Sequence, residues 1–221
     1  MSLSKKIQIY FMPGMAASSK IFELLHLPQD KFETHFLEWK LPKKDEPINL
    51  YAKRMSEEIR HKNAILVGVS FGGVLVQEMA KFVNPKKVVI ISSVKSCAEL
   101  PKRMQWAKNM ALYKIFPSRL LKEIPNLKVL AITKSLKKKF QLYDVYFYRK
   151  ESVYLDWAVK NMLCWNVVDS NPNIIHIHGT ADNVFPIKNI KNCIAVKGGT
   201  HAMILTKAKW FNENLPNLLD N

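Results

Sequence analysis

Residues 65–82 read ILVGVSFGGVLVQEMAKF, and this stretch decides the fold. Its apolar start, from Asn63 to Val69, predicts a buried strand, and the apolar spacing after Phe71 predicts a helix. Between them, three of the chain's seven glycines surround Ser70 in the pattern G-x-S-x-G-G. This pattern at a strand-to-helix turn is typical of a nucleophile elbow, in which a strained turn exposes the serine hydroxyl. The alternative is an ordinary turn in which Ser70 caps the helix.

The glycines of this turn have a steric reason and a chemical consequence. Gly68 and Gly72 stand two residues before and after Ser70, where strand and helix approach too closely for a Cβ atom. Gly73 relieves further crowding. The Phe71 N–H points into the space in front of the serine, where it would stabilise an oxyanion.

Strand and helix patterns alternate along most of the 221-residue chain. Helices are expected at 18–27, from an N-cap at Asn49 to His61, from Phe71 to about Asn84, and from about His201 onward. This alternation predicts an α/β fold, with a mostly parallel sheet of about six strands flanked by helices. The expected strands are 6–11, 32–39, 63–69, 87–92, 173–178 and 192–196.

Residues 95–165 interrupt this alternation. Tyr154, Trp157, Ala158 and Met162 share one face of a helical pattern, and no clear strand is visible in the whole segment. We therefore predict a helical lid at 95–165, inserted into a core formed by 1–94 and 166–221. The helical segments are expected at 101–116, 117–124, 127–140 and 151–165.

The formal net charge is +16, and the segment from Lys95 to Lys150 contains 14 basic and only 3 acidic residues. The chain holds 29 Lys and only 5 Arg, whereas phosphate-binding sites favour the bidentate guanidinium of arginine. Because no nucleic-acid-binding motif accompanies the charge, we expect no specific nucleic-acid partner. The run from Lys134 to Phe140 is expected to be a solvated face, with weak association with anionic substrates or surfaces as the alternative.

The remaining bulk features predict one cytoplasmic domain. The length suits a single core, and no apolar run approaches the ~20 residues of a membrane span. The N-terminal residues do not form a secretory signal. Cys97, Cys164 and Cys193 are scattered without a C-x-x-C pair, which argues against a disulfide framework or a zinc site. We expect no metal and no organic cofactor.

The other four glycines fall in three loops that each follow a predicted strand. In a parallel sheet, the carboxyl ends of the strands form one rim, where sites are built. Two of these loops carry the partners that a serine nucleophile needs: Asp182 in HGTAD and His201 in GGTH. His201 would accept the proton of Ser70, and Asp182 would orient the imidazole.

With these motifs the chain resembles the α/β-hydrolases over nearly its whole length. The elbow, the G-x-x-D loop after a late strand and the G-x-x-H loop before the last helix carry the resemblance, in the family's order Ser…Asp…His. The segment 95–165 occupies the family's usual lid position. Where the family often has a histidine before its first glycine, this chain has Met12-Pro13-Gly14. The resemblance implies that Ser70 is the nucleophile, Asp182 the acid and His201 the base. It also implies that the N–H groups of Phe71 and Met15 are the two oxyanion donors.

Other residues compete for these roles. Asp156 and Asp169 could replace Asp182, but one lies in a helical lid segment and the other precedes a strand. His178 approaches the site from the end of its strand, and Ser92, Ser93 and Cys97 end a strand at the same rim. The other histidines are expected away from the base position: His26, His35, His61 and His176.

An apolar acyl pocket is expected beneath the lid, although the same side chains could simply pack lid helices together. Its candidate substrate-binding residues are Met12, Trp106, Met110 and Trp157, and Met104, Tyr113 and Met162 could join them.

We expect a serine hydrolase that cleaves an ester or thioester through an acyl-enzyme on Ser70, carboxylesterase-like, with a small or medium acyl substrate. An acyltransferase or a C–C bond hydrolase could use the same three residues. A non-catalytic ligand-binding or protein-binding member of the fold is the remaining alternative, because fold does not imply function.

Overall fold

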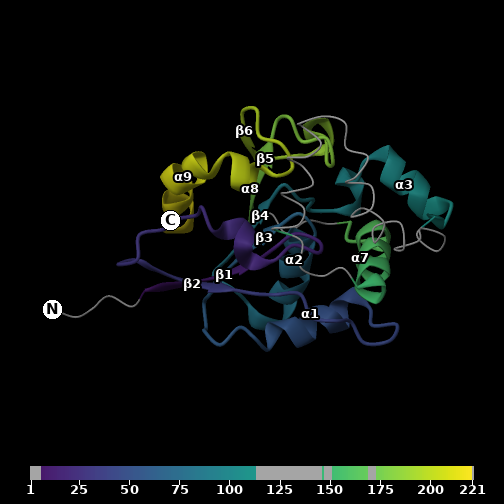
Figure 1. Ribbon diagram of the computed structural model, residues 1–221, viewed down its shortest axis with the longest axis horizontal. Coiled ribbons are helices and arrows are strands. Elements are labelled where there is room, and N and C mark those ends of the chain that lie inside the picture. Colours follow the sequence, from purple (N-terminus) through teal and green to yellow (C-terminus); the bar gives the residue numbers. More distant parts are fainter. Residues whose placement is uncertain (1–5, 113–145, 147–150, 169–172, 221) are drawn as a thin grey trace, which may run out of the picture.

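The structure is a computed structural model that describes residues 6–112, 146, 151–168 and 173–220. In these residues, six parallel strands form a single sheet in the order β2-β1-β3-β4-β5-β6 (Figure 1). The α/β prediction with about six strands is therefore confirmed. The strands are β1 Ile7–Met12, β2 Phe32–Phe36, β3 Ile65–Val69, β4 Lys87–Ile91, β5 Ile174–Gly179 and β6 Ile194–Val196.

The register of the strands brings their carboxyl ends to one rim. Met12 of β1 pairs with Gly68 of β3, and Val69 of β3 pairs with Ile91 of β4. Because every strand runs in the same direction, the loops that follow β1, β3, β4, β5 and β6 all leave the sheet at this rim.

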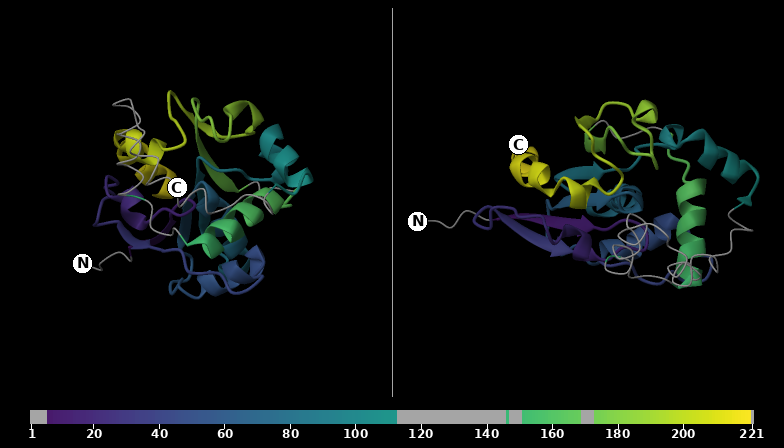
Figure 2. Two further views of the ribbon diagram at one scale, coloured as in Figure 1. Left: turned by 45° about the vertical axis from the view of Figure 1, so that its right-hand side comes forward. Right: turned by 45° about the horizontal axis from the view of Figure 1, so that its top comes forward.

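Helices cover both faces of the sheet (Figures 1 and 2). Helices α1 (Ile48–Ser56) and α2 (Phe71–Val83) pack on the face that carries Tyr10 and Met12 of β1. The opposite face carries Ile9 and Phe11, and it packs against α8 (Met203–Thr206), α9 (Ala208–Asp220) and the 3-10 turn η1 (Ser19–Phe22). Alternate residues of β1 thus enter two separate cores, as expected for a strand with helices on both sides.

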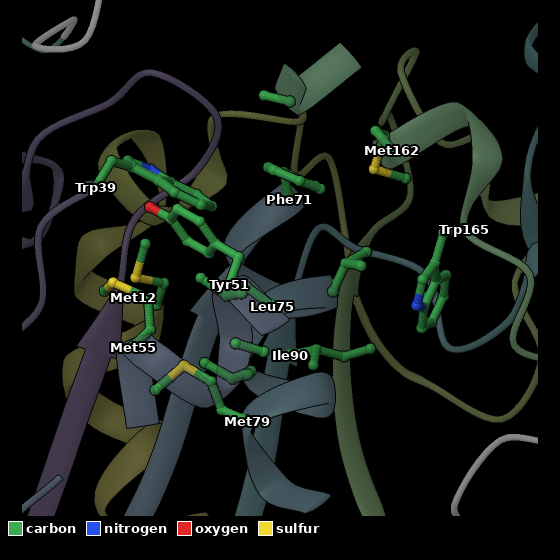
Figure 3. Packing of buried hydrophobic residues seen from close by; sticks show 14 of the residues in the cluster. Met12, Trp39, Tyr51, Met55, Phe71, Leu75, Met79, Ile90, Met162 and Trp165 are labelled. Atoms are coloured by element: carbon green, nitrogen blue, oxygen red, sulfur yellow. The ribbon is translucent and has the colours of Figure 1, made fainter. Parts of the chain in front are cut away.

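Aromatic rings fill the core beside the start of α2 (Figure 3). The Trp39 and Phe71 rings stack with their centroids 5.2 Å apart, and the Tyr51 and Trp157 rings are 4.3 Å apart. The centroid of the Tyr154 ring lies 5.5 Å from that of Trp39. Both Tyr154 and Trp157 belong to α7 (Ser152–Cys164), so this helix of the predicted lid segment is packed into the core of the domain.

The ends of several helices differ from the sequence predictions. The helix expected at 18–27 is only the single 3-10 turn η1, which buries Ile21 and Phe22, while Leu25 and Leu27 pack against the same core from the non-helical chain that follows. Asn49 is not an N-cap: the cap is Pro47, two residues earlier, and α1 ends at Ser56 and not at His61. A proline before the first turn starts the helix without a side-chain cap.

Part of the predicted lid can be compared with the structure. Helix α3 (Lys102–Asn109) lies within the first expected segment, and α7 lies within the last. The helical face of Tyr154, Trp157, Ala158 and Met162 is buried, as predicted. The segments expected at 117–124 and 127–140, including the basic run from Lys134 to Phe140, lie outside the described residues. None of the helices described here is both long and apolar enough to cross a membrane.

We predict that Gly72→Ala destabilises the fold although alanine is the better helix former. A Cβ at Gly72 would lie 2.3 Å from the carbonyl oxygen of Pro13 and 2.6 Å from that of Met12. Such overpacking costs about 1–3 kcal/mol, more than the ~1 kcal/mol that helix propensity returns. Urea unfolding of the wild type and the variant measures the difference.

Gly14→Ala is the matched control for this substitution. A Cβ at Gly14 would have its nearest neighbours at 3.5 and 3.6 Å, which is ordinary van der Waals contact. Its free energy of unfolding should stay within about 0.5 kcal/mol of the wild type. Equal losses in the two variants would contradict the proposed clash.

Candidate active site

Ser70 occupies the turn between β3 and α2 with φ 53° and ψ −121°, a conformation that costs a non-glycine residue free energy. Hydrogen bonds on both sides hold it there. The Ser70 N–H donates to the Ile91 carbonyl at 2.9 Å, and the Ser70 carbonyl accepts from Ser93 Oγ at 2.7 Å and from the Gly73 N–H at 2.9 Å. The strained turn is therefore fastened to the adjacent strand β4 and to the first turn of α2.

The loops after β5 and β6 bring an acid and a base to this serine. Ser70 Oγ lies 2.9 Å from His201 Nε2, and His201 Nδ1 lies 2.9 Å from Asp182 Oδ2. Since the carboxylate only accepts, His201 donates from Nδ1 and its Nε2 accepts the hydroxyl proton of Ser70. The structure thus joins the three predicted catalytic residues in one chain of hydrogen bonds.

The surroundings of Asp182 favour its ionised form. Its side chain is fully buried, and burial alone would raise the pKa of Asp182. The hydrogen bond from His201 and two backbone N–H groups outweigh burial and hold the pKa below its ordinary value. Those N–H groups belong to Val184 and Phe185 and donate to Oδ1 at 2.8 and 2.9 Å.

The loop after β1 passes beside Ser70 and carries the predicted oxyanion donor Met15. A Cβ on Gly14 would be 3.5 Å from Ser70 Cβ, which measures how closely the two turns approach. In the described part of the chain, no hydrogen-bond acceptor takes the N–H of Met15 or of Phe71. Both residues line the cavity in front of the serine, so both predicted donors stand beside it.

Two aromatic side chains that were not among the predicted site residues hold this loop. Trp39 Nε1–H donates to the Gly14 carbonyl at 2.7 Å, and the Ala16 N–H donates to Tyr154 Oη at 3.1 Å. Trp39 follows β2 and Tyr154 belongs to α7, so the two anchors come from distant parts of the sequence. No local motif marks them, and in the folded chain the Trp39 ring packs on both Phe71 and Tyr154.

A cavity of about 600 Å³ opens in front of Ser70 and His201. This volume is in the range of small-molecule sites. Among the described residues its wall is almost wholly apolar and includes no Lys, Arg, Asp or Glu. Aliphatic and aromatic side chains from four regions form most of it: Ala17, Ile21, Leu155, Val159, Met162, Leu163, Phe185, Ile204 and Leu205.

The four predicted substrate-binding residues lie elsewhere, which corrects that part of the sequence analysis. Met12 and Trp157 are buried in the core, where Trp157 Nε1–H donates to the Glu46 carbonyl at 2.6 Å. Trp106 and Met110, on and just after α3, are 60% and 56% exposed. Of the other lid candidates, Met104 and Met162 do line the cavity, and Tyr113 lies outside the described residues.

The competing residues are also separated by the structure. Asp182 is the carboxylate beside His201, whereas Asp156 lies exposed on α7 and Asp169 is outside the described residues. Ser93 supports the elbow through its hydroxyl. The His35 and His61 rings stack with their centroids 5.0 Å apart beside Tyr10 of β1, and neither lines the cavity at Ser70 and His201.

Two further histidines, His176 and His178, are buried on β5, next to the loop that carries Asp182. Burial, His178 and Lys95 lower the pKa of His176 to about 3. Burial also lowers the pKa of His178, although the Phe185 carbonyl and Asp182 oppose the change. Both imidazoles are therefore neutral around pH 7.

Across the described residues the three cysteines are free, and no three His, Cys, Asp or Glu side chains gather as a metal site would require.

A scan against protein-family models found no match, and neither did a search of the curated proteins. Solved structures do match. An epoxide hydrolase from Bacillus megaterium is 16% identical with a TM-score of 0.68, covering 100% of this chain and 96% of that one. An esterase from Exiguobacterium antarcticum is 15% identical with a TM-score of 0.66, covering 98% and 93%. An enol-lactonase from Burkholderia xenovorans is 11% identical with a TM-score of 0.68, covering 100% and 94%. This chain therefore has the α/β-hydrolase fold, as its motifs predicted.

We predict that His176 makes the protein less stable in mild acid. Its folded pKa of about 3 lies below the ordinary 6.5, so below that pH the unfolded chain binds a proton that the folded chain does not. The free energy of unfolding should fall as the pH drops from about 6.5 toward 3, by up to about 1.4 kcal/mol per pH unit. Urea unfolding at pH 7, 6 and 5 measures this slope. His176→Gln, which does not titrate, should show a shallower slope, and an unchanged slope would refute the assignment.

Proposed function

We propose that this chain is a serine hydrolase that cleaves a carboxylic ester or thioester through an acyl-enzyme on Ser70. The observation that carries the proposal is the hydrogen-bonded chain from Ser70 Oγ through His201 to the buried Asp182. A serine hydroxyl is a weak nucleophile at its free pKa, and an adjacent oriented base is what activates it. The α/β-hydrolase fold and its esterase and lactonase neighbours support the same reaction class.

The proposed reaction has two steps. Ser70 Oγ attacks the substrate carbonyl carbon while its proton passes to His201 Nε2, and the imidazolium then protonates the departing alcohol or thiol. In the second step a water gives its proton to His201 and attacks the acyl carbon, which releases the acid and returns the proton to Ser70. Asp182 stays ionised throughout and stabilises the imidazolium.

Two backbone N–H groups serve as the proposed oxyanion hole. The Phe71 N–H is at the first turn of α2, where the helix dipole also favours negative charge. The Met15 N–H lies in the loop that Trp39 and Tyr154 hold. Donors fixed before the reaction cost no reorganisation when the oxyanion forms, and one such donor is typically worth 10²–10³ in rate.

The segment 95–165 remains our proposed lid over this cavity. Helix α7 supplies Leu155, Val159 and Met162 to the cavity wall, and Met104 comes from α3. An acyl chain seated here would be in contact with apolar side chains on every described side, whereas a charged acyl group would lose water without gaining a partner.

We predict a single adduct when the protein is treated with a fluorophosphonate and weighed by intact-mass spectrometry. Ser70→Ala should give no adduct because the attacking oxygen is gone. His201→Ala should label at least about 100-fold more slowly, since the general base is lost. A folded wild-type protein that does not label would contradict the proposed nucleophile. Retained labelling of Ser70→Ala would place the reactive group elsewhere.

We also predict a preference for neutral, apolar acyl groups. With p-nitrophenyl esters from acetate to octanoate, kcat/KM should rise by up to about fourfold for each added methylene until the cavity is filled, which corresponds to ~0.8 kcal/mol per buried CH₂. The control is an ester of equal length that ends in a carboxylate, which we expect to be at least about tenfold poorer. Equal or better turnover of the anionic ester would instead support a role for the basic segment.

A further inference from the structure

We propose that His178 is a positioning residue for Asp182, acting through the Phe185 backbone, and that His176 sets the tautomer in which it does so. This inference rests on the proposed function, because it assigns supporting residues to the same triad. Its evidence is a set of buried hydrogen bonds that the proposed reaction does not itself use.

The first step concerns the proton on His178. Its Nε2 lies 2.8 Å from the carbonyl oxygen of Phe185, which can only accept, so Nε2 carries the proton. His178 Nδ1 lies 3.1 Å from His176 Nε2. Because a neutral His178 has no second proton, its Nδ1 accepts and His176 Nε2–H donates.

The second step concerns the end of this chain. His176 Nδ1 is buried and makes no hydrogen bond among the described residues, whereas His176 Nε2 lies 3.1 Å from His178 Nδ1, so the single proton is better placed on Nε2. His176 is therefore a neutral donor through Nε2. One arrangement of protons satisfies both contacts: His176 Nε2–H to His178 Nδ1, and His178 Nε2–H to the Phe185 carbonyl.

The third step connects this pair to the triad. Phe185 is held at both ends of its backbone: its carbonyl accepts from His178, and its N–H donates to Asp182 Oδ1 at 2.9 Å. Its ring packs edge-on against the His201 imidazole, 5.4 Å between centroids. His178 thus holds a residue that touches both Asp182 and His201. A displacement of this turn by about 1 Å would reduce the rate by up to ~100-fold.

The neutral state of His178 is also required by its distance from the acid. His178 Nε2 lies 3.6 Å from Asp182 Oδ2, the oxygen that binds His201. A cationic imidazole there would compete with His201 for this carboxylate. The charged or titratable groups that act on the pair are Asp182, His201, Glu99 and Lys95. His176 Nε2–H donates to His178 Nδ1. This hydrogen bond occupies the lone pair of Nδ1, so His178 does not take up a second proton there.

The test compares His178→Leu, which removes the donor, with His178→Gln, whose amide can still donate to the Phe185 carbonyl. We expect the fluorophosphonate labelling rate of His178→Leu to fall by about 10- to 100-fold with KM for a neutral ester unchanged. His178→Gln should recover to within about fivefold of the wild type. His61→Leu is the matched control, because it removes a hydrogen-bonded histidine beside Tyr10 and should lower stability without changing the labelling rate.

A second readout does not depend on nucleophilic chemistry. The proton between His201 Nδ1 and Asp182 should give a far-downfield NMR resonance in the wild type, shifted or broadened in His178→Leu and restored in His178→Gln. In His176→Leu, His178 Nδ1 can take up a proton. We therefore expect the labelling rate of this variant to fall at a higher pH than that of the wild type when the pH is lowered.

The outcomes separate the two proposals. A wild type that does not label refutes the proposed nucleophile, while the NMR resonance still tests the position of Asp182. Unchanged labelling and an unchanged resonance in His178→Leu, with only a lower melting temperature, would overturn the positioning role. If His178→Leu does not fold, a glutamine variant with a wild-type resonance and rate supports the role, and one with a lost resonance overturns it.

Discussion

The approach of α2 to the loop after β1 is the constraint on which the rest of this structure depends. At Gly72 there is no room for even one methyl group, because the carbonyl oxygens of Met12 and Pro13 occupy that space. The loop with Met15 lies beside Ser70, and the serine holds a positive φ at the start of the same helix. This backbone contact brings together Ser70, the N–H groups of Met15 and Phe71 that we propose as oxyanion donors, and the N-terminus of α2.

The acid side of the site is built in a different way. There the supporting contacts are side chain to backbone: Asp182 accepts from Val184 and Phe185, and His178 donates to the Phe185 carbonyl. Burying a carboxylate is costly unless its oxygens are satisfied, and the Asp182 carboxylate accepts hydrogen bonds from Val184, Phe185 and His201. The backbone strain is therefore at Ser70, whereas the loop that carries Asp182 is held by several hydrogen bonds.

Much of the fold and of the hydrogen-bonded chain Ser70–His201–Asp182 could be predicted because both depend on local patterns. Apolar runs marked all six strands, and the G-x-S-x-G turn, the G-x-x-D loop and the G-x-x-H loop marked the three triad residues. The pocket was harder, because which face of a helix meets a cavity depends on how that helix is packed. Trp106 and Trp157 are the same residue type in helical segments, yet Trp106 is exposed on α3 and Trp157 is buried against Tyr51.

The sequence by itself determined the strand order along the chain, the elbow at Ser70 and the residue types that could serve it, because glycine spacing and hydrophobic period are properties of neighbouring residues. Only the tertiary structure decided what surrounds them. Trp39 and Tyr154 anchor the loop after β1 across 25 and 138 residues of sequence, and His178 reaches the loop that carries Asp182 through the Phe185 carbonyl. Contacts of this kind leave no local pattern, because they form only when the sheet brings distant segments to one rim.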